Sequence, residues 1–447
     1  MSKLFGTDGI RGVANQYPMT PQFALQLGQA AANRLSSKGK PKIVVGKDTR
    51  ISSDMLEAAL SAGITSAGGD VLKVGVLPTP AIAYLTKTFS AQAGIVISAS
   101  HNPFDNNGIK FFGTNGLKLK DEIEDEIEEA LAKSEEVIYP TGAGIGNVIE
   151  VTNAHLQYLN FIKSTITNSL YLNGEKIVID CANGATSFVA SSLFQELGAE
   201  VIPLNCQPNG TNINLDCGSL HPEKTAETVK AQNAMVGFCY DGDGDRVIAI
   251  DDDGKIVDGD FIMAICAKYL KENDMLNNNL LVTTVMSNIG LYIALKKLNI
   301  DVVKTKVGDR YVIEQMLEKG AVLGGEQSGH IIFLDYFTTG DGILTSIQLL
   351  TIMQKTYTPL SKLAQIMKKY PQVLINVKVK DKKTDLNTIP ELQLAIKLGE
   401  EALKEEGRIL VRYSGTESLA RVMVEGPTED EINKIAKNIA SVIEEKL

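Results

Sequence analysis

Short runs of apolar, mostly β-branched residues recur along this chain, and each run ends in a turn of small or polar residues. Three clear examples are Ile43–Val45, Ile95–Ile97 and Ile177–Ile179. Apolar runs of this length, bounded by turn residues, are typical of strands buried inside a sheet. Helical patterns lie between them, and one starts at Thr20, a plausible N-cap, with Pro21 at the first helical position. The alternation predicts an α/β fold.

Breaks in the pattern divide the chain into four segments, whereas a length of 447 residues by itself predicts roughly three domains. The last segment reads as α+β, because residues 373–379 alternate in polarity like a strand and a helix with one apolar face ends the chain. Thr428 and Glu431 are spaced as a capping box at the start of that helix. The predicted domains are 1–151, 152–253, 254–369 and 370–447.

Charge and composition argue against several classes of partner. A formal charge of −10 disfavours sequence-independent nucleic-acid binding, and the chain has no Trp for stacking bases. No apolar run of about 18 residues predicts a membrane span, and the N-terminus lacks the apolar core of a signal peptide. The five cysteines form no CxxC pair. We therefore expect a cytoplasmic protein with no nucleic-acid or membrane partner.

Three aspartates alternate with glycines directly after the strand pattern Met235–Tyr240. They are Asp241, Asp243 and Asp245. Glycine spacers permit tight turns, so that three carboxylates can converge on one hard cation. This pattern predicts a metal site. A second acidic cluster, Asp251–Gly254, is interpreted as a solvated hairpin turn.

The loop Ser98–Pro103 follows a buried strand, where α/β proteins often place active-site residues. It offers two hydroxyl groups and the imidazole of His101. A serine here could accept a phosphoryl group, but the pattern does not choose between Ser98 and Ser100. The alternative is a plain Ser/Asn/Pro turn.

Two further polar loops contain glycine. Side chains of Gly324–His330 could hydrogen-bond the hydroxyl groups of a polyol, although an exposed turn explains the pattern about as well. Residues Arg412–Glu417, with Arg421 shortly after, combine cations, hydroxyls and a glycine that suit a dianionic phosphate. The loop is not a P-loop, because GxxxxGK[ST] is absent there.

These four loops, in this order, resemble the α-D-phosphohexomutase family. The matching motifs are Ser-His-Asn-Pro at 100–103, Asp-Gly-Asp-Gly-Asp-Arg at 241–246, Gly-Glu-Gln-Ser-Gly-His at 325–330 and Arg-Tyr-Ser-Gly-Thr-Glu at 412–417. The resemblance implies three related α/β domains with mixed sheets and a smaller C-terminal α+β domain, heart-shaped around a central cleft. Tyr413 and Ser418 stand where the family usually has proline.

Within that family the chain most resembles the bacterial members that interconvert glucosamine 6-phosphate and glucosamine 1-phosphate. The resemblance implies that Ser100 carries the phosphoryl group and that a hexose 1,6-bisphosphate is the intermediate and activator. It implies one Mg²⁺ per chain, held by the phosphate on Ser100 and by Asp241, Asp243 and Asp245. It also suggests sugar phosphates as the small-molecule partners and a homodimer.

The resemblance implies two further groups of site residues. The predicted catalytic residues are Ser100, Lys110, His330, Arg11 and His101. The predicted substrate-binding residues are Arg246, Glu326, Ser328, Arg412, Ser414, Gly415, Thr416 and Arg421.

Three alternatives compete with this hypothesis. The chain could act on another sugar, as a phosphoglucomutase or phosphomannomutase. It could be a magnesium-dependent phosphatase of the haloacid-dehalogenase type, with Asp241 as nucleophile and Asp243 as acid/base. That class usually has Thr or Val where this chain has Asp245. The third alternative is a sugar-phosphate-binding protein without catalysis, which the presence of Ser100 and all three aspartates disfavours.

Overall fold

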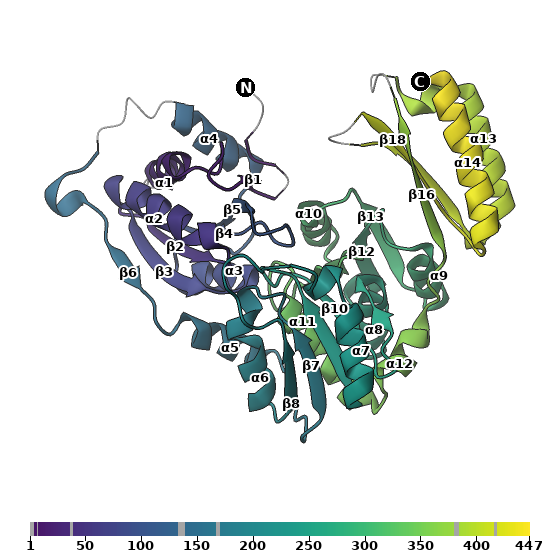
Figure 1. Cartoon of the computed structure of the whole chain (residues 1–447), viewed down its shortest axis with the longest axis horizontal. Coiled ribbons are helices and arrows are strands. Elements are labelled where there is room, and N and C mark those ends of the chain that lie inside the picture. Colours follow the sequence, from purple (N-terminus) through teal and green to yellow (C-terminus); the bar gives the residue numbers. More distant parts are fainter. Residues whose placement is uncertain are drawn as a thin grey trace. The chain divides into compact units, whose positions relative to one another are not determined.

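The chain forms two compact units in the computed structural model (Figure 1). The structure describes residues 4–6, 8–35, 39–132, 139–166, 170–379, 384–414 and 418–447. The first unit comprises residues up to Met286 together with Val302–Ala364, and the second comprises Ser287–Asp301 and Gln365–Leu447. No helix among the described residues is both long and apolar enough to cross a membrane.

The first domain is built on a six-stranded mixed sheet in the order β1-β5-β4-β2-β3-β6. Strands β4, β2, β3 and β6 are parallel, and β5 pairs antiparallel with both β4 and β1. Its strands are β1 (Ile10–Val13), β2 (Lys42–Lys47), β3 (Asp70–Val76), β4 (Ala93–Ile97), β5 (Asn106–Gly113) and β6 (Val148–Glu150). Its helices are α1 (Pro21–Leu35), α2 (Ile51–Ser66), α3 (Thr79–Thr88) and α4 (Asp121–Ala132).

Helix α1 begins where the sequence predicts. The Thr20 hydroxyl accepts a hydrogen bond of 3.2 Å from the Phe23 amide, which satisfies one of the free N–H groups at the helix start. Phe23, Leu27 and Ala31 lie on one face of the helix and are buried in the core of this domain. The predicted cap and the predicted start of the helix are both confirmed.

The second domain has a five-stranded mixed sheet in the order β11-β10-β9-β7-β8. Its strands are β7 (Lys176–Asp180), β8 (Glu200–Leu204), β9 (Val236–Tyr240), β10 (Val247–Ile250) and β11 (Ile256–Val257), and its helices are α5 (Ala154–Ser164), α6 (Ala190–Glu196) and α7 (Glu223–Gln232). Strands β10 and β11 pair antiparallel across Asp251–Gly254, which confirms the predicted hairpin turn. Asp252 and Asp253 are exposed, whereas Asp251 is buried.

The third domain has a four-stranded sheet in the order β13-β12-β14-β15, in which helices connect β12 to β13 and β13 to β14. The strands are β12 (Leu280–Thr284), β13 (Asp301–Thr305), β14 (Leu323–Gly325) and β15 (Ile331–Phe333). The helices are α8 (Gly259–Glu272), α9 (Ile289–Lys297), α10 (Asp309–Lys319), α11 (Gly342–Thr356) and α12 (Leu360–Leu363), of which α9 belongs to the second compact unit.

Asp341 caps helix α11 from a buried position. Its carboxylate accepts hydrogen bonds from the Leu344 amide at 2.9 Å and from the Tyr158 hydroxyl at 2.9 and 3.0 Å. Burial raises the pKa of Asp341 to about 6, and the capping bonds only partly offset that effect. The folded protein therefore binds the proton on Asp341 more tightly than the unfolded chain does.

We expect Asp341 to contribute stability at low pH that is lost as the pH rises. The contribution is complete below about pH 4 and gone above about pH 6, a difference of up to about 3 kcal/mol at about 1.4 kcal/mol per pKa unit. Asp341→Asn removes the titrating group, so its unfolding temperature relative to the wild type should rise between pH 4 and pH 7. Thermal unfolding across that range measures this. Asp335→Asn, at an exposed position, is the control, and a pH-independent difference for Asp341→Asn would contradict the prediction.

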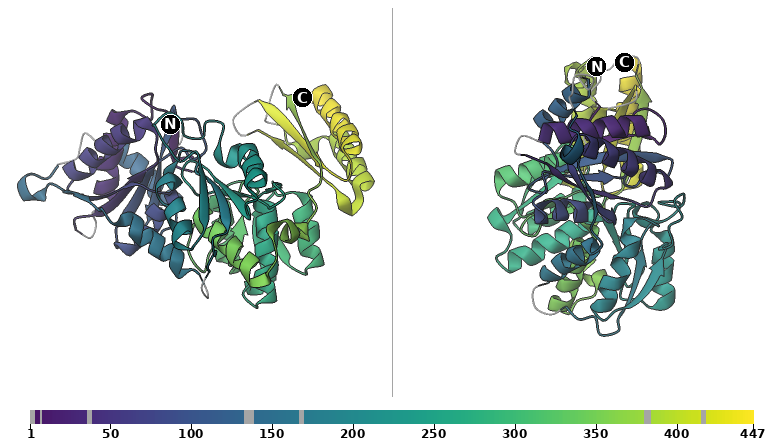
Figure 2. Two further views of the ribbon diagram at one scale, coloured as in Figure 1. Left: turned by 60° about the horizontal axis from the view of Figure 1, so that its bottom comes forward. Right: turned by 90° about the vertical axis from the view of Figure 1, so that its left-hand side faces the viewer.

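The second unit contains the predicted α+β domain. Strands β16 (Gln372–Lys378), β18 (Leu419–Glu425) and β17 (Arg408–Tyr413) form an antiparallel sheet in that order. Helices α13 (Pro390–Leu403) and α14 (Glu429–Lys446) lie together on one face of it (Figures 1 and 2). The buried Glu425 carboxylate accepts from the Ile289 amide at 2.9 Å, which joins the start of α9 to this sheet.

The apolar face predicted for the final helix is confirmed, because Ile432 and Ile439 are buried against the sheet and Ile435 and Val442 pack beside them. The capping-box prediction is only half right. Thr428 is the N-cap residue of α14, but its side chain makes no capping hydrogen bond.

The fold class is as predicted, with three α/β domains and a smaller α+β domain. The heart-shaped outline stays a prediction.

Candidate active site

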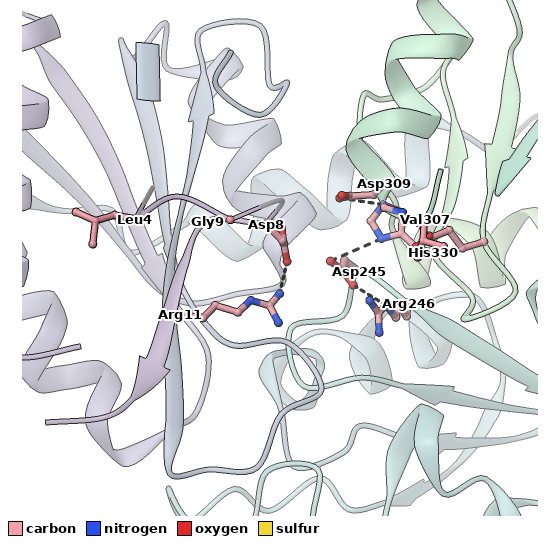
Figure 3. Close-up of a pocket in the computed structure, with 12 residues that line it drawn as sticks. Leu4, Asp8, Gly9, Arg11, Asp245, Arg246, Val307, Asp309 and His330 are labelled. Atoms are coloured by element: carbon pink, nitrogen blue, oxygen red, sulfur yellow. Dashed lines mark hydrogen bonds and ion pairs between the residues drawn. The ribbon is translucent and has the colours of Figure 1, made fainter. Parts of the chain in front are cut away.

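A cavity of about 440 Å³ lies in the first unit, and five of the predicted site residues line it (Figure 3). Asp8 and Arg11 form one wall, facing Asp245, Arg246 and His330 on the other. The complete lining is Leu4, Gly6, Asp8, Gly9, Arg11, Asp245, Arg246, Val307, Gly308, Asp309, Glu326 and His330. Cations and carboxylates converge here from three domains, which suits a small, highly polar ligand.

The three predicted metal ligands lie together, and one of them, Asp245, lines the cavity. Asp241, Asp243 and Asp245 occupy the turn between β9 and β10, and each contributes a carboxylate oxygen within 4.8 Å of the others. The turn needs glycine at its second position, because a Cβ on Gly242 would lie 2.7 Å from the Ser100 carbonyl oxygen. All three carboxylates are buried.

The electrostatics of this cluster favour a bound cation. Burial, together with the charges of Asp245 and Asp243, holds the pKa of Asp241 well above its ordinary value. The Asp243 and Asp245 Oδ1 atoms are buried and accept no hydrogen bond from any described residue. Oxygen-only ligands are the set that Mg²⁺ and other hard cations prefer. The cluster could therefore hold a metal ion.

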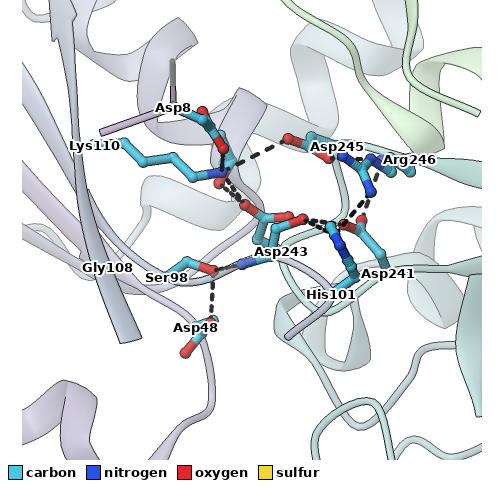
Figure 4. A network of polar contacts seen from close by, with 12 residues as sticks. Asp8, Asp48, Ser98, His101, Gly108, Lys110, Asp241, Asp243, Asp245 and Arg246 are labelled. Atoms are coloured by element: carbon cyan, nitrogen blue, oxygen red, sulfur yellow. Dashed lines mark hydrogen bonds and ion pairs between the residues drawn. The ribbon is translucent and has the colours of Figure 1, made fainter. Parts of the chain in front are cut away.

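Ser100 faces the aspartate cluster, and Ser98 faces away from it. The Ser100 hydroxyl donates to Asp241 Oδ2 at 2.7 Å. The Ser98 hydroxyl donates instead to Asp48 at 2.6 Å and accepts a hydrogen bond from the Ser100 amide at 2.9 Å (Figure 4). Of the two serines left open by the residue pattern, Ser100 is the one in contact with the metal-binding candidates, and Ser98 supports the loop.

Lys110 on β5 reaches into the same cluster. Its Nζ atom lies 2.8 Å from Asp243, 3.1 Å from Asp8 and 3.8 Å from Asp245 (Figure 4). Burial alone would lower the pKa of Lys110, but these three carboxylates together raise it above the ordinary lysine value. Lys110 is therefore protonated at neutral pH, which suits a proton donor or a fixed positive charge better than a base.

His101 and Arg246 form a second contact beside Ser100. The Arg246 guanidinium donates to His101 Nδ1 at 2.8 Å, so that ring nitrogen carries no proton. Burial and the charges of Arg246 and Arg11 lower the pKa of His101 to about 4, which keeps the ring neutral at pH 7. Arg11 forms an ion pair with Asp8 on the opposite wall of the cavity.

The predicted sugar loop joins β14 to β15 and places two side chains in the cavity. Glu326 accepts a hydrogen bond from the Gly308 amide at 3.1 Å, which orients its carboxylate. His330 Nε2 accepts from the Gly340 amide at 3.1 Å, and its Nδ1 lies 3.7 Å from Asp245. Ser328, in the same loop, is exposed.

The protonation of His330 depends on the charge of Asp245. Burial lowers the pKa of His330, but Asp245, Asp309 and Glu326 outweigh it and raise the value to about 8. The hydrogen bond from Gly340 requires an unprotonated Nε2, however, and so belongs to the neutral ring. A cation held by Asp245 would cancel that carboxylate's effect and favour the neutral form with its proton on Nδ1.

The predicted phosphate loop lies in the second unit. Arg412 on β17 and Arg421 on β18 are directly opposite each other in the strand register, and Ser414 is buried beside them. The two guanidinium groups carry like charges at opposed positions and repel each other. A dianion bound between them would be stabilised, because it pairs with both. Gly415 and Thr416 lie outside the described residues.

Sequence reasoning missed several residues that shape this site. Asp48 and Arg50 follow β2, and both contact the predicted phosphoserine loop, Ser98–Pro103. Asn214 from the second domain contacts the same loop. Lys118 joins Asp8 to Asp309 beside the cavity. For Asp48 and Arg50, the one local signal in the sequence is that they form an Asp-x-Arg pair directly after a buried strand.

Comparison with known proteins identifies the family. Models of the phosphoglucomutase/phosphomannomutase family match nearly the whole chain: alpha/beta/alpha domain I at residues 2–138, domain II at 156–254, domain III at 258–370 and the C-terminal domain at 374–442. The chain belongs to the phosphoglucomutase/phosphomannomutase family. The predicted resemblance is thereby confirmed, and the family assignment overturns the haloacid-dehalogenase alternative.

Members of this family that are similar to the chain share its full length. Phosphoglucosamine mutase from Geobacter sp. strain M21 is 54% identical, with 100% of this chain and 99% of the relative covered. The protein of the same name from Brevibacillus brevis is 51% identical, with both chains fully covered.

Solved structures that are similar to this chain have the same fold. A phosphoglucomutase/phosphomannomutase family protein from Burkholderia thailandensis has a TM-score of 0.80 at 25% identity, covering 99% of this chain and 97% of its own. N-acetylphosphoglucosamine mutase from Aspergillus fumigatus, solved with GlcNAc-6P and magnesium, has a TM-score of 0.67 at 16% identity, covering 99% and 95%.

Proposed function

We propose that this chain is a phosphosugar mutase that interconverts glucosamine 6-phosphate and glucosamine 1-phosphate. The observation that carries the proposal is the hydrogen bond from the Ser100 hydroxyl to Asp241, within a buried three-carboxylate cluster. A serine beside a metal site is the arrangement needed for reversible phosphoryl transfer through the protein. The full-length similarity to proteins named phosphoglucosamine mutase supports the choice of sugar.

In the proposed reaction, phosphorylated Ser100 gives its phosphoryl group to the free hydroxyl of the bound sugar phosphate. A P–O bond to the sugar forms, the bond to Ser100 Oγ breaks, and a hexose 1,6-bisphosphate results. The bisphosphate then turns around and returns its other phosphate to Ser100. His330 is the candidate for accepting the proton of the sugar hydroxyl, and Lys110, which is protonated, is the candidate for donating a proton to Ser100 Oγ as its bond to phosphorus breaks. Lys110 also stabilises negative charge, because it stays protonated beside Asp243.

The aspartate cluster fits one Mg²⁺, which Asp241, Asp243 and Asp245 would hold together with the phosphate on Ser100. Two buried carboxylate oxygens without hydrogen-bond donors among the described residues support this fit. When bound, the ion would offset the charge on the transferring phosphoryl group. Arg246 and Arg11 line the cavity and would bind the anionic substrate, with His101 beside Arg246.

The remaining predicted residues would hold the sugar and its second phosphate. Glu326, fixed by the Gly308 amide, would accept hydrogen bonds from the sugar, and Ser328 lies in the same loop. The opposed arginines of β17 and β18 support a phosphate site there. That proposed site consists of Arg412, Ser414, Gly415, Thr416 and Arg421. The homodimer, the cytoplasmic location and the domain boundaries stay predictions.

Assays of three sugar phosphates test the choice of substrate. We expect kcat/KM for glucosamine 6-phosphate to exceed those for glucose 6-phosphate and mannose 6-phosphate by at least about tenfold, or about 1.4 kcal/mol of transition-state discrimination. An equal or larger kcat/KM for either alternative would overturn the substrate assignment. Phosphopeptide mass spectrometry tests the reaction class, because a mutase carries phosphate on Ser100 whereas a binding protein does not.

A further inference from the structure

A buried arginine outside the phosphoserine loop holds the main chain of that loop. Arg50, which is 2% exposed, follows β2 and uses all five of its N–H groups. Nη2 donates to the Ser100 carbonyl at 2.9 Å and to the Asn102 carbonyl at 2.8 Å. Nη1 donates to the carbonyls of Asn106, at 3.0 Å, and Pro103. The rigid fork of a guanidinium can reach four carbonyls at once, which an ammonium cannot.

Arg50 is itself held by Asp48. Its Nε atom donates to Asp48 Oδ2 at 2.9 Å, and the same oxygen accepts from the Ser98 hydroxyl. The other oxygen, Oδ1, accepts from the Arg50 amide at 3.0 Å and from the Ser53 hydroxyl at 3.1 Å. Both partners are almost fully buried, so the pair has a single well-defined geometry.

Asn214 contacts the same two carbonyls from the second domain. It lies in the connection between β8 and α7, and its Nδ2 atom donates to the Ser100 carbonyl at 2.9 Å and the Asn102 carbonyl at 3.1 Å. Each carbonyl therefore receives two hydrogen bonds, one from Arg50 and one from Asn214. Gly242 makes room for this contact, because a Cβ there would lie 2.7 Å from Asn214 Nδ2.

The loop needs such support because Ser100 has an unfavourable backbone conformation. Its φ of +53° lies in the left-handed region, which costs a residue other than glycine about 1–2 kcal/mol. Strain of this kind persists only where surrounding contacts determine it. The conformation turns the Ser100 carbonyl toward Arg50 and Asn214, and the hydroxyl toward Asp241.

We infer that Arg50 and Asn214 are positioning residues for phosphoryl transfer. They clamp the Ser100 and Asn102 carbonyls and thereby hold the Ser100 hydroxyl against Asp241. The inference rests on the proposed function, in which Ser100 carries the phosphoryl group. Both residues direct side-chain N–H groups to the Ser100 and Asn102 carbonyls, so they act on the main chain of the loop.

The clamp predicts a loss in kcat with little change in KM. Asn214→Ala removes one donor from each carbonyl, and we expect kcat to fall about tenfold while KM stays within about twofold. Arg50→Lys keeps a charge beside Asp48 but loses the fork, and we expect kcat to fall about 100-fold, the scale of a 1 Å misplacement of reacting groups. Steady-state assays with glucosamine 6-phosphate measure both.

Two control variants match these changes. Asn212→Ala lies in the same loop and has similar exposure, but its side chain hydrogen-bonds Gln207 and Asn209. Arg34→Lys removes a partly exposed guanidinium that pairs with Glu126 in the first domain. Both should keep kcat within about twofold of the wild type, because neither touches residues 98–106.

Amide hydrogen exchange tests the positioning role of Arg50 and Asn214 independently of the proposed function. Exchange over residues 98–106 should be at least about tenfold faster in Asn214→Ala and Arg50→Lys than in the wild type and the controls, whichever sugar is the substrate. A normal kcat in both variants, a loss confined to KM, or unchanged exchange would overturn the inference. If Arg50→Lys fails to fold, Asn214→Ala decides.

Discussion

Ser100→Ala is expected to lower turnover by at least about 10³-fold while sugar-phosphate binding stays close to that of the wild type. The variant loses the hydroxyl oxygen that would carry the phosphoryl group beside Asp241, whereas the cavity lining remains intact. Coupled assays measure turnover, and calorimetric titration with glucosamine 6-phosphate measures binding. The wild-type protein should carry phosphate on Ser100, detected in the corresponding peptide.

Ser98→Ala is the matched control for this prediction. The Ser98 hydroxyl accepts a hydrogen bond from the Ser100 amide and donates to Asp48, so its loss loosens the loop without removing the phosphoryl carrier. We expect a fall in kcat of about tenfold. Near-normal turnover in Ser100→Ala, or phosphate found on Ser98, would contradict the assignment of Ser100.

Removing the metal is expected to stop turnover reversibly, and replacing one aspartate should raise the magnesium requirement. Asp243→Asn should have the largest effect, because Asp243 also pairs with Lys110 at 2.8 Å. We expect the Mg²⁺ concentration for half-maximal activity to rise by about 10–100-fold in this variant. Magnesium titrations followed by activity and, separately, by calorimetry on phosphorylated protein measure it.

Asp253→Asn is the control for the metal prediction. Asp253 is an exposed aspartate in the turn between β10 and β11, where it pairs with Lys255. Its replacement should leave the magnesium requirement unchanged, because the turn contributes no ligand to the cluster of Asp241, Asp243 and Asp245. Absence of calorimetric binding to the phosphorylated wild type would contradict a magnesium site.

Local sequence patterns placed most of the elements that carry the site. The runs at Ile95–Ile97 and Met235–Tyr240 form β4 and β9, and the loops that follow them hold Ser100 and the aspartates. These predictions succeed because strand periodicity and turn chemistry depend on a few neighbouring residues. The capping box at Thr428 shows the limit, since the residue is in place but its hydroxyl makes no capping bond.

The sequence by itself determined the family, the fold class and the residue types of the four loops. The choice between Ser98 and Ser100 on physical grounds required the tertiary structure, because the deciding partner, Asp241, is 141 positions away from Ser100. Asn214 could not be predicted for the same reason, because it lies 114 positions from the carbonyl that it holds. Arg50 lies 50 positions from that carbonyl, and its one local signal is the Asp-x-Arg pair after β2. A hydrogen bond depends on distance in space, and only folding brings residues this far apart in sequence within 3 Å.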